Sequence, residues 1–397
     1  MLSKEENELL TRAGPGTPGG ALLRRYWHPI CPAADLAAET AVQRVQLLGE
    51  RLVVFRLPDG QYGLLDEHCP HRGVSLRYGF VEDDGLRCAY HGWKFDRDGR
   101  CLEQPFEPAS STFKDRICQR AYRVRKLCGL LWAYLGPEPV PLIPRWDVLV
   151  LPGERRIDVH PVLESNWLSP MENSMDTTHT YYLHAMMLQK LGLPGGEYYA
   201  RPIEDYGFEP FEWGLLKRRT YGGPQPEVER GHPVIFPNVL RVPSRMGPAI
   251  HWRVPLNDAQ TLIVEVNWQP DGNDEPLDEP PDPEVYRLSS LRTPDGDFDL
   301  ASFPGQDKMA YETSGPIFDR SREHVGVSDR GIIMYRTLLR EQIEIVRQGG
   351  EPMGIIRDPE QNRVIRFQTS KGPAPDEWAL RQRGLLADAS SGARGAR

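Results

Sequence analysis

Short runs of β-branched and aromatic residues, separated by turn residues, dominate the first third of the chain. The predicted strands span residues 52–56, 62–65, 94–96, 122–125 and 130–135. Asp59-Gly60 separates the first two runs, and Asp98-Gly99 follows the third. An aspartate–glycine pair beside such runs is a strong short-range signal of a β-hairpin. The pattern therefore predicts an all-β module built from hairpins.

The second half of the chain shows further strand-like alternation and then changes to a helical pattern. The predicted strands span residues 156–160, 215–220, 234–242, 250–254 and 261–267. Residues 270–284 are rich in proline, aspartate and glutamate, which predicts an exposed loop. Apolar side chains recur at helical spacing over residues 328–347, before Gly349-Gly350. We expect an α+β domain with helices packed on one side of an antiparallel sheet.

The two ends of the chain carry their own short-range signals. Ser3 with Glu6 fits a capping box that opens a short helix, which Gly14-Pro15-Gly16 ends. Residues 387–397 are mostly small and polar. We expect this tail to be disordered, because it has too little apolar surface to pack.

Composition and charge limit the kind of protein. The 397 residues include 48 basic and 56 acidic side chains, for a net charge of −8 and an isoelectric point near 5.8. This balance offers no basic surface for nucleic acid or for an anionic membrane. The sequence begins without a signal-peptide pattern and has no run of about 18 apolar residues. We therefore expect a cytoplasmic protein with reduced thiols.

Two loops carry the most specific chemistry. Cys69 and His71 lie in Cys-Pro-His-Arg-Gly, and Cys88 and His91 lie in Cys-Ala-Tyr-His-Gly-Trp. Two thiolates and two imidazoles are the ligand set of a Rieske [2Fe–2S] centre. A structural zinc site is the alternative, but zinc fingers usually pair both cysteines in one knuckle. One cysteine and one histidine per loop therefore favours the iron–sulfur cluster.

A second candidate metal site lies in residues 172–184. His179 and His184 beside Asp176 suggest half of a 2-His-1-carboxylate triad, which leaves open positions on ferrous iron for dioxygen. On a regular helix Asn173, Asp176 and His179 share a face, but His184 would lie about 140° away. The helix must therefore end, tighten or bulge if one iron is to reach both histidines.

These two motifs together resemble a known family. Cysteine–histidine loops followed about 85 residues later by Asn-x-x-Asp-x-x-His-x₄-His resemble the catalytic α-subunit of the Rieske non-haem iron oxygenases. The resemblance covers nearly the whole chain. Segments 7–18, 144–147 and 231–238 resemble the branch that contains phthalate dioxygenase and dehydrodivanillate O-demethylase.

The resemblance implies a role for each residue of the second motif. His179 and His184 would bind a mononuclear iron, and Asp307 in the segment 306–312 would be the third ligand, with Glu312 and Asp319 as alternatives. Asp176 would bridge a cluster histidine of the neighbouring subunit to an iron-ligand histidine. The shared helix face independently makes Asn173 a candidate to support the same site, and a hydrogen bond to the helix backbone is the alternative role. His71 and His91 would hold the outer iron of the cluster, and Cys69 and Cys88 the inner iron.

The resemblance also implies an organisation and a set of partners. An N-terminal helical segment at 1–25 would pack on the catalytic domain at 140–385, a Rieske domain would span 26–139, and the tail would be 386–397. Family members of this branch form trimers or stacked trimers of one subunit type. The chain has neither a Gly-x-Gly-x-x-Gly signature nor a plant-type ferredoxin motif, so it would bind no flavin or NAD. A separate NAD(P)H-dependent reductase would supply electrons.

The expected activity is oxygenation of an aromatic compound. An O₂-dependent enzyme of this family would O-demethylate or hydroxylate a substrate, expected to be a carboxylated, lignin-like or phthalate-like molecule. Cis-dihydroxylation of the ring is the alternative. A Rieske electron carrier is a remote third possibility, because it would need only about 110 residues and would leave His179 and His184 unexplained. Arg241 and Arg253 are candidates to bind a substrate carboxylate. Lys217-Arg218-Arg219 is interpreted as a solvated strand face, with a carboxylate clamp as the alternative.

Overall fold

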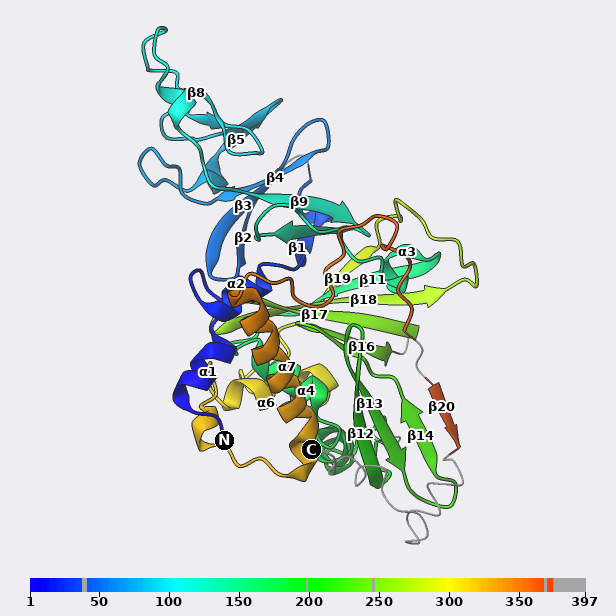
Figure 1. Ribbon diagram of the computed structural model, residues 1–397. Coiled ribbons are helices and arrows are strands. Elements are labelled where there is room, and N and C mark those ends of the chain that lie inside the picture. Colours follow the sequence, from blue (N-terminus) through cyan, green and yellow to red (C-terminus); the bar gives the residue numbers. More distant parts are fainter. Residues whose placement is uncertain (38–40, 198, 245–246, 368–369, 374–397) are drawn as a thin grey trace.

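The computed structural model describes residues 1–37, 41–197, 199–244, 247–367 and 370–373 (Figure 1). A β region from the first third of the chain lies above two long strands, β17 (Gly247–Asn257) and β18 (Gln260–Pro270). Most of the helices lie below these strands. The predicted tail at 386–397 lies outside the described residues.

Two antiparallel sheets form the upper β region. A six-stranded sheet has the order β1-β10-β9-β4-β3-β2, and a four-stranded sheet has the order β5-β6-β7-β8. The strands of the larger sheet are β1 (His28–Pro32), β2 (Val42–Leu47), β3 (Glu50–Arg56), β4 (Tyr62–Asp66), β9 (Ala121–Leu127) and β10 (Leu130–Tyr134). The smaller sheet contains β5 (Phe80–Glu82), β6 (Gly85–Arg87), β7 (Lys94–Phe95) and β8 (Cys101–Glu103). The predicted all-β hairpin module is therefore confirmed.

The lower domain is built on one large sheet. Its order is β19-β11-β18-β17-β16-β15-β13-β14-β20, and β12 also pairs with β13. The remaining strands are β11 (Gly153–Val159), β12 (Ile203–Phe211), β13 (Gly214–Tyr221), β14 (Glu227–Arg230), β15 (Val234–Ile235), β16 (Val239–Ser244), β19 (Glu284–Arg287) and β20 (Ser370–Pro373). All of these pairings are antiparallel except β11 with β19. This arrangement agrees with the predicted α+β domain.

One predicted strand is wrong. Residues 234–242 do not form one continuous strand, because the chain reverses at Phe236-Pro237-Asn238 and β15 pairs antiparallel with β16. Pro237 has no N–H group to offer a sheet ladder, so it lies in the turn between the two strands.

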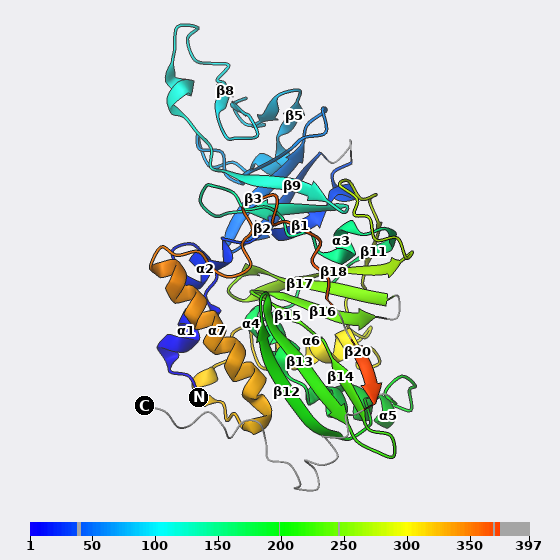
Figure 2. The same cartoon turned by 45° about the vertical axis from the view of Figure 1, so that its right-hand side comes forward.

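The α-helices of the described part of the chain are α1 (Lys4–Thr11), α2 (Pro18–Leu23), α3 (Asp147–Val150), α4 (Leu168–Met175), α5 (Met187–Lys190), α6 (Phe303–Thr313) and α7 (Arg330–Arg347). Helices α1, α4, α6 and α7 lie below β17 and β18, whereas α3 lies above these strands beside β11 (Figure 1). Short 3₁₀ segments span Ala33–Asp35, Leu76–Tyr78, Phe113–Arg116, Arg320–Arg322 and Val327–Asp329, and a π-helix spans Thr180–Met186. Figure 2 shows α1 and α7 together on one flank and β12, β13 and β14 on the other. No helix in the described part of the chain is long and apolar enough to cross a membrane.

The terminal helices agree with their sequence signals. Ser3 and Glu6 form both hydrogen bonds of a capping box at the start of α1. The predicted helix at 328–347 is α7, which buries an apolar face that includes Tyr335, Leu339 and Ile343. These contacts fix α7 against α2 and α4, so it supports the helix that leads into the second candidate metal site.

Candidate active site

The two cysteine–histidine loops share one backbone conformation. In each loop, the glycine four residues after the cysteine has a φ of +73°, and its N–H donates to the cysteine carbonyl. These bonds are Gly73 to Cys69, at 2.8 Å, and Gly92 to Cys88, at 3.0 Å. Only glycine adopts this left-handed conformation readily. Each loop therefore folds its cysteine and histidine back toward the other loop.

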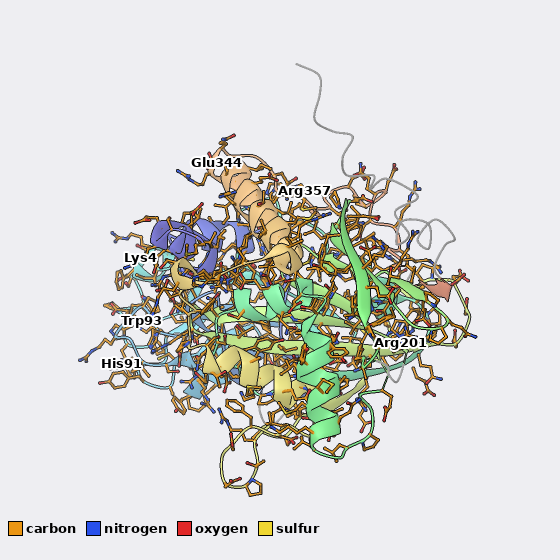
Figure 3. All side chains as sticks on the ribbon, turned by 90° about the horizontal axis from the view of Figure 1, so that it is seen from below. Lys4, His91, Trp93, Arg201, Glu344 and Arg357 are labelled. Carbon is orange, nitrogen blue, oxygen red and sulfur yellow. The ribbon has the colours of Figure 1, made fainter. Side chains whose placement is uncertain are left out.

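The four side chains meet between these loops. The rings of His71 and His91 lie 4.6 Å apart, and His71 stacks on Trp93 at 4.3 Å. Both thiols are buried, and burial beside Cys88 raises the pKa of Cys69 to about 12 even though backbone N–H groups of His71 and Arg72 donate to its sulfur. His91 Nδ1 is buried without a hydrogen-bond partner among the described residues. Figure 3 shows His91 and Trp93 at the edge of the molecule. A [2Fe–2S] cluster would deprotonate both thiols and use the free imidazole nitrogens, so the residues fit it.

The second candidate metal site depends on an irregular helix. Helix α4 ends before Asp176, which has extended backbone, and the chain re-enters helical geometry as a π-helix that contains His184. A π-helix bonds residues five apart, which brings His179 and His184 together with ring centroids 5.2 Å apart. The expected irregularity between the two histidines is therefore confirmed.

Helix α6 brings a carboxylate to these histidines. Ligand atoms of His179, His184 and Asp307 all lie within 4.8 Å of one another, and His184 Nε2 is 3.6 Å from Asp307 Oδ1. Buried Gln306 accepts a hydrogen bond from His184 Nδ1 at 2.8 Å, which leaves the Nε2 lone pair facing the carboxylate. Asp307 Oδ1 is buried without a hydrogen-bond partner in the described part of the chain. This donor set fits a ferrous ion.

Asp176 lies beside this group on the opposite side of His179. Its Oδ2 is 3.4 Å from His179 Nδ1, and its Oδ1 accepts hydrogen bonds from Thr178 N and Oγ1 at 2.7 and 2.9 Å. Burial raises the pKa of Asp176, but the contacts with His179 and Thr178 outweigh it and hold the pKa below its usual range. The Asp176 carboxylate is therefore ionised, and it lies beside Nδ1 of His179.

The two alternative carboxylates are engaged elsewhere. Glu312 binds Lys308 and Arg292, and it also accepts a hydrogen bond from the backbone of Glu164. Asp319 accepts hydrogen bonds from the backbone and hydroxyl of Ser321 at the start of a 3₁₀ turn. Neither carboxylate belongs to the group of ligand atoms around the two histidines.

A cavity of about 240 Å³ opens beside these three residues. Its wall includes Asn173, His179, His184 and Asp307, together with strand residues from β13, β16, β17 and β18. Tyr199 and Phe303 add aromatic surface, since their rings lie 6.4 and 4.5 Å from that of His184. The cavity is large enough for a small aromatic molecule.

The expectation that Lys217-Arg218-Arg219 is a solvated face is wrong for two of the three residues. Only Arg218 points outward, where it pairs with Asp205 at 2.6 Å. Lys217 and Arg219 are 7% and 4% exposed and line the cavity, because alternate residues of β13 face the core. Burial, with a smaller effect from the nearby Arg219, lowers the pKa of Lys217 to about 7.

The two arginine candidates have different positions. Arg241 is 2% exposed and does not line the cavity, because both of its terminal nitrogens bind Asp147, at 3.0 and 3.1 Å. The expectation that Arg241 contacts a substrate is therefore corrected. Arg253 does line the cavity, and among the described residues its side chain donates only to the carbonyl of His251, at 3.3 Å. The sequence analysis named Lys217 but favoured the solvated interpretation for it. It missed Gln306, for which the neighbouring Asp307 was the only signal.

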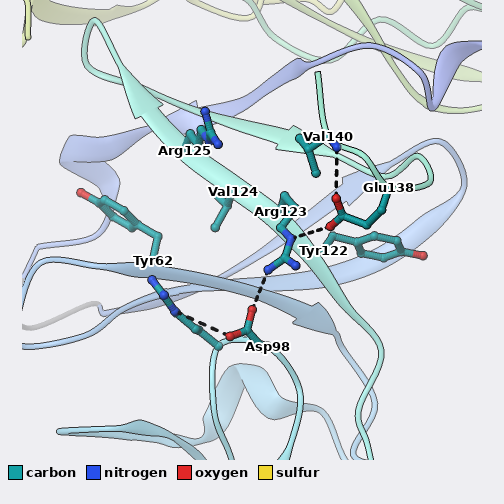
Figure 4. Close-up of a pocket in the computed structure, with 9 residues that line it drawn as sticks. Tyr62, Asp98, Tyr122, Arg123, Val124, Arg125, Glu138 and Val140 are labelled. Carbon is teal, nitrogen blue, oxygen red and sulfur yellow. Dashed lines mark hydrogen bonds and ion pairs between the residues drawn. The ribbon is translucent and has the colours of Figure 1, made fainter. Parts of the chain in front are cut away.

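A second hollow, of about 480 Å³, lies on the upper β region (Figure 4). Arg123 on β9 spans it and binds both Asp98, at 2.7 Å, and Glu138, at 3.1 Å. Its wall contains no cysteine or histidine. The opposite charges are paired with each other, and we assign no chemistry to this surface.

Comparisons with known proteins place both halves of the chain. A model of the Rieske [2Fe-2S] domain matches residues 26–114, and a model described as "LigXa C-terminal domain like" matches residues 291–382. The first match contains both cysteine–histidine loops, and the second contains Asp307. The boundary expected after residue 139 stays a prediction.

Two curated relatives cover nearly the whole chain. The 5,5'-dehydrodivanillate O-demethylase oxygenase subunit of Sphingobium sp. is 37% identical over 93% of this chain and 87% of its own length. The phthalate 4,5-dioxygenase oxygenase subunit of Pseudomonas putida is 31% identical over 93% and 92%. A structure of NdmA, QL mutant, from Pseudomonas putida CBB5 with caffeine has a TM-score of 0.58 at 21% identity, over 87% of this chain and 99% of its own, which supports the fold. The chain has two cofactors, a Rieske [2Fe–2S] cluster and a mononuclear iron. The chain belongs to the Rieske non-haem iron oxygenases, as the oxygenase subunit of a multicomponent enzyme.

Proposed function

We propose that this oxygenase subunit acts on an aromatic carboxylate, which it O-demethylates or hydroxylates with O₂ and with electrons from a reductase. One observation carries the proposal. The cavity beside His179, His184 and Asp307 contains two buried cations, Lys217 and Arg253, that have no carboxylate partner among the described residues. A buried charge without a partner is costly, so an anionic ligand is the natural complement of this cavity.

The metal-binding residues have separate roles in this proposal. Cys69, His71, Cys88 and His91 hold the cluster, and the group of His179, His184 and Asp307 holds the ferrous iron. When bound, this iron supplies the activation of dioxygen. Gln306 fixes the His184 ring so that Nε2 is the ligand atom, and Asn173 lies at the cavity wall near the same histidines. Orientation of ligand rings by such hydrogen bonds is a common requirement of metal sites.

Lys217 and Arg253 provide the binding energy for the substrate carboxylate. Both reach the cavity from the large sheet, Lys217 from β13 and Arg253 from β17. Charge-assisted hydrogen bonds to a carboxylate are about twice as strong as neutral ones. The names of both relatives describe activity on aromatic acids, dehydrodivanillate and phthalate, which is the same substrate chemistry.

We further propose that the chains assemble head to tail, as a homotrimer or as stacked trimers. Large aromatic side chains are exposed around the cluster loops, among them Phe106, at 87%, and Tyr90, at 53%. Tyr182, at 75%, is exposed beside the second metal site. Figure 1 places β5 and β8 at the upper end of the molecule and α4 and α6 in its lower half. A neighbouring copy that covers both surfaces would bring its cluster to Asp176, which would then connect a cluster histidine to His179.

Co-expression of two defective chains tests this assembly. One chain carries Cys69→Ser and Cys88→Ser and lacks the cluster, while the other carries His179→Ala and lacks the mononuclear iron. Turnover in the mixed oligomer, absent from either parent, is expected if electrons cross between subunits. Equal inactivity of mixed oligomers with both chains present would contradict the arrangement.

The reaction itself is tested by metal content and by products. The purified subunit is expected to contain about three irons per chain, whereas a pure Rieske carrier would hold about two. With a surrogate reductase and 3-methoxybenzoate, O-demethylation releases formaldehyde. Uncoupled O₂ consumption with every aromatic acid tested would refute the proposed substrate class.

Cis-dihydroxylation remains the second candidate activity, since one of the two relatives is named a dioxygenase. The same metal centre serves both reactions, and the substrate carbon that faces the iron decides between them. A dihydrodiol product from benzoate or phthalate, without formaldehyde from methoxylated acids, would favour dihydroxylation.

A further inference from the structure

A carboxylate held between two imidazoles forms another part of the cavity wall. Glu265 on β18 lies directly opposite His251 on β17, and His160 follows the adjacent strand β11. Glu265 Oε1 is 3.3 Å from His251 Nε2, and Oε2 is 3.3 Å from His160 Nε2. All three side chains line the cavity that contains the candidate iron ligands.

The charge of Glu265 favours a proton on the ring nitrogen that faces it in each histidine. Burial raises the pKa of Glu265, but the two histidines lower it far more, so the carboxylate is ionised and can only accept. His160 Nε2 is within hydrogen-bond geometry of this carboxylate and donates to it. His251 Nε2 is buried 3.3 Å from Oε1 without hydrogen-bond geometry, and the negative charge beside it favours a proton on this nitrogen over Nδ1. Burial also lowers the pKa of His251, so this ring is neutral at pH 7 and its Nδ1 is an acceptor.

The acceptor on His251 has no protein partner. Among the described residues nothing hydrogen-bonds to its Nδ1. This atom is also not one of the fully buried polar atoms, so part of its surface is accessible. The guanidinium groups of Arg219 and Arg253, and Lys217 when protonated, can only donate. The cavity therefore presents hydrogen-bond donors to an anionic group of a ligand. His251 presents an acceptor, which is satisfied by an O–H or N–H group of the same ligand.

The hydrogen-bond acceptor on His251 and the cation of Arg253 lie close enough to bind one small molecule. His251 and Arg253 are two residues apart on β17 and both line the cavity. Their Cα atoms lie about 6.6 Å apart along the strand, so both side chains can reach one molecule of the size of a hydroxybenzoate. A carboxylate on Arg253 and Lys217 would thus place a ring hydroxyl near His251.

Building on the proposed function, we propose that the substrate is a hydroxylated aromatic carboxylate and that His251 accepts the hydrogen bond of its ring hydroxyl. Glu265 is the positioning residue that selects the His251 tautomer. His160 completes the pairing of the Glu265 carboxylate. The array thereby makes the hydroxyl a determinant of specificity.

The test is calorimetric binding of 3-methoxybenzoate, 3,4-dimethoxybenzoate and 4-hydroxy-3-methoxybenzoate to the holoenzyme. The wild type is expected to bind the hydroxylated acid about tenfold more tightly than either hydroxyl-free acid. His251→Gln keeps an N–H donor toward Glu265 and removes the Nδ1 acceptor. This variant should lose the preference, while its affinity for 3-methoxybenzoate stays within about twofold.

Two further variants separate recognition from a structural role. Glu265→Gln offers His251 a donor, which favours the opposite tautomer, so it should also lose the hydroxyl preference. His324→Gln, at an exposed histidine outside the cavity, should keep it. A preference retained in His251→Gln, or absent from the wild type, would overturn the inference. Failure of the wild type to bind any of the three acids would instead refute the proposed aromatic carboxylate.

Discussion

Replacement of Lys217 by methionine should stabilise the protein and weaken substrate binding. Lys217 is 7% exposed, and no side chain in the described part of the structure neutralises it by a hydrogen bond or ion pair. Its pKa falls from the ordinary 10.5 to about 7, mainly because of burial. At about 1.4 kcal/mol per pH unit, the buried charge costs up to about 4 kcal/mol of folding free energy at pH 7. The unfolded state binds more protons between these values, so the cost is full below pH 7 and disappears above about 10.5.

Methionine keeps much of the apolar stem and removes the charge. We therefore expect a higher thermal midpoint by calorimetry, together with a dissociation constant for 3-methoxybenzoate about 10- to 100-fold larger, as for loss of a charged hydrogen bond. Lys308→Met is the matched control, because Lys308 is equally buried but is bound to Glu312 and to the carbonyl of Val162. That variant should lower the midpoint. A fall in stability for Lys217→Met like that of the control, or unchanged affinity, would refute the reasoning.

Three further predictions address the metals and the pH dependence. Gln306→Leu removes the acceptor that orients His184, so affinity for the mononuclear iron should fall about 10- to 100-fold. Metal analysis measures this loss. Bleaching of the cluster absorption in the same variant would contradict two separate metal centres. Asp176→Asn should leave both centres loaded and nearly abolish turnover, and loss of the mononuclear iron would show that Asp176 supports the ligands instead. Affinity for 3-methoxybenzoate should fall as pH rises above about 7, because Lys217 becomes neutral, and Lys217→Arg should remove this fall in calorimetric titrations.

Features that depend on neighbouring residues in the chain could be predicted from the sequence. The cysteine–histidine loops depend on glycines at 73 and 92, four residues after each cysteine, and both adopt the left-handed turn. The five-residue interval from His179 to His184 required an irregular helix, and the π-helix supplies it. In both cases the constraint lies within a few residues, where geometry leaves few solutions.

Features that depend on distant partners could not be predicted in the same way. Arg241 looked available for a substrate, but its partner Asp147 lies 94 residues earlier in the chain. Alternation on β13 indicated that Lys217 and Arg219 share a face, yet it did not say which face is buried. Lysine normally faces water, so its burial here required knowledge of the sheet that covers it.

The same reasoning bears on the choice between demethylation and dihydroxylation. A carboxylate held only by Lys217 and Arg253 would leave the ring free to rotate about the bond between carboxylate and ring. A second contact, from a ring hydroxyl to His251, would stop that rotation and present one edge of the ring to the metal site. Because positioning within a fraction of an ångström controls such reactions, loss of the second contact should change which carbon is oxidised. A mixture of products from His251→Gln, where the wild type gives one, would therefore locate the control of the reaction in this histidine.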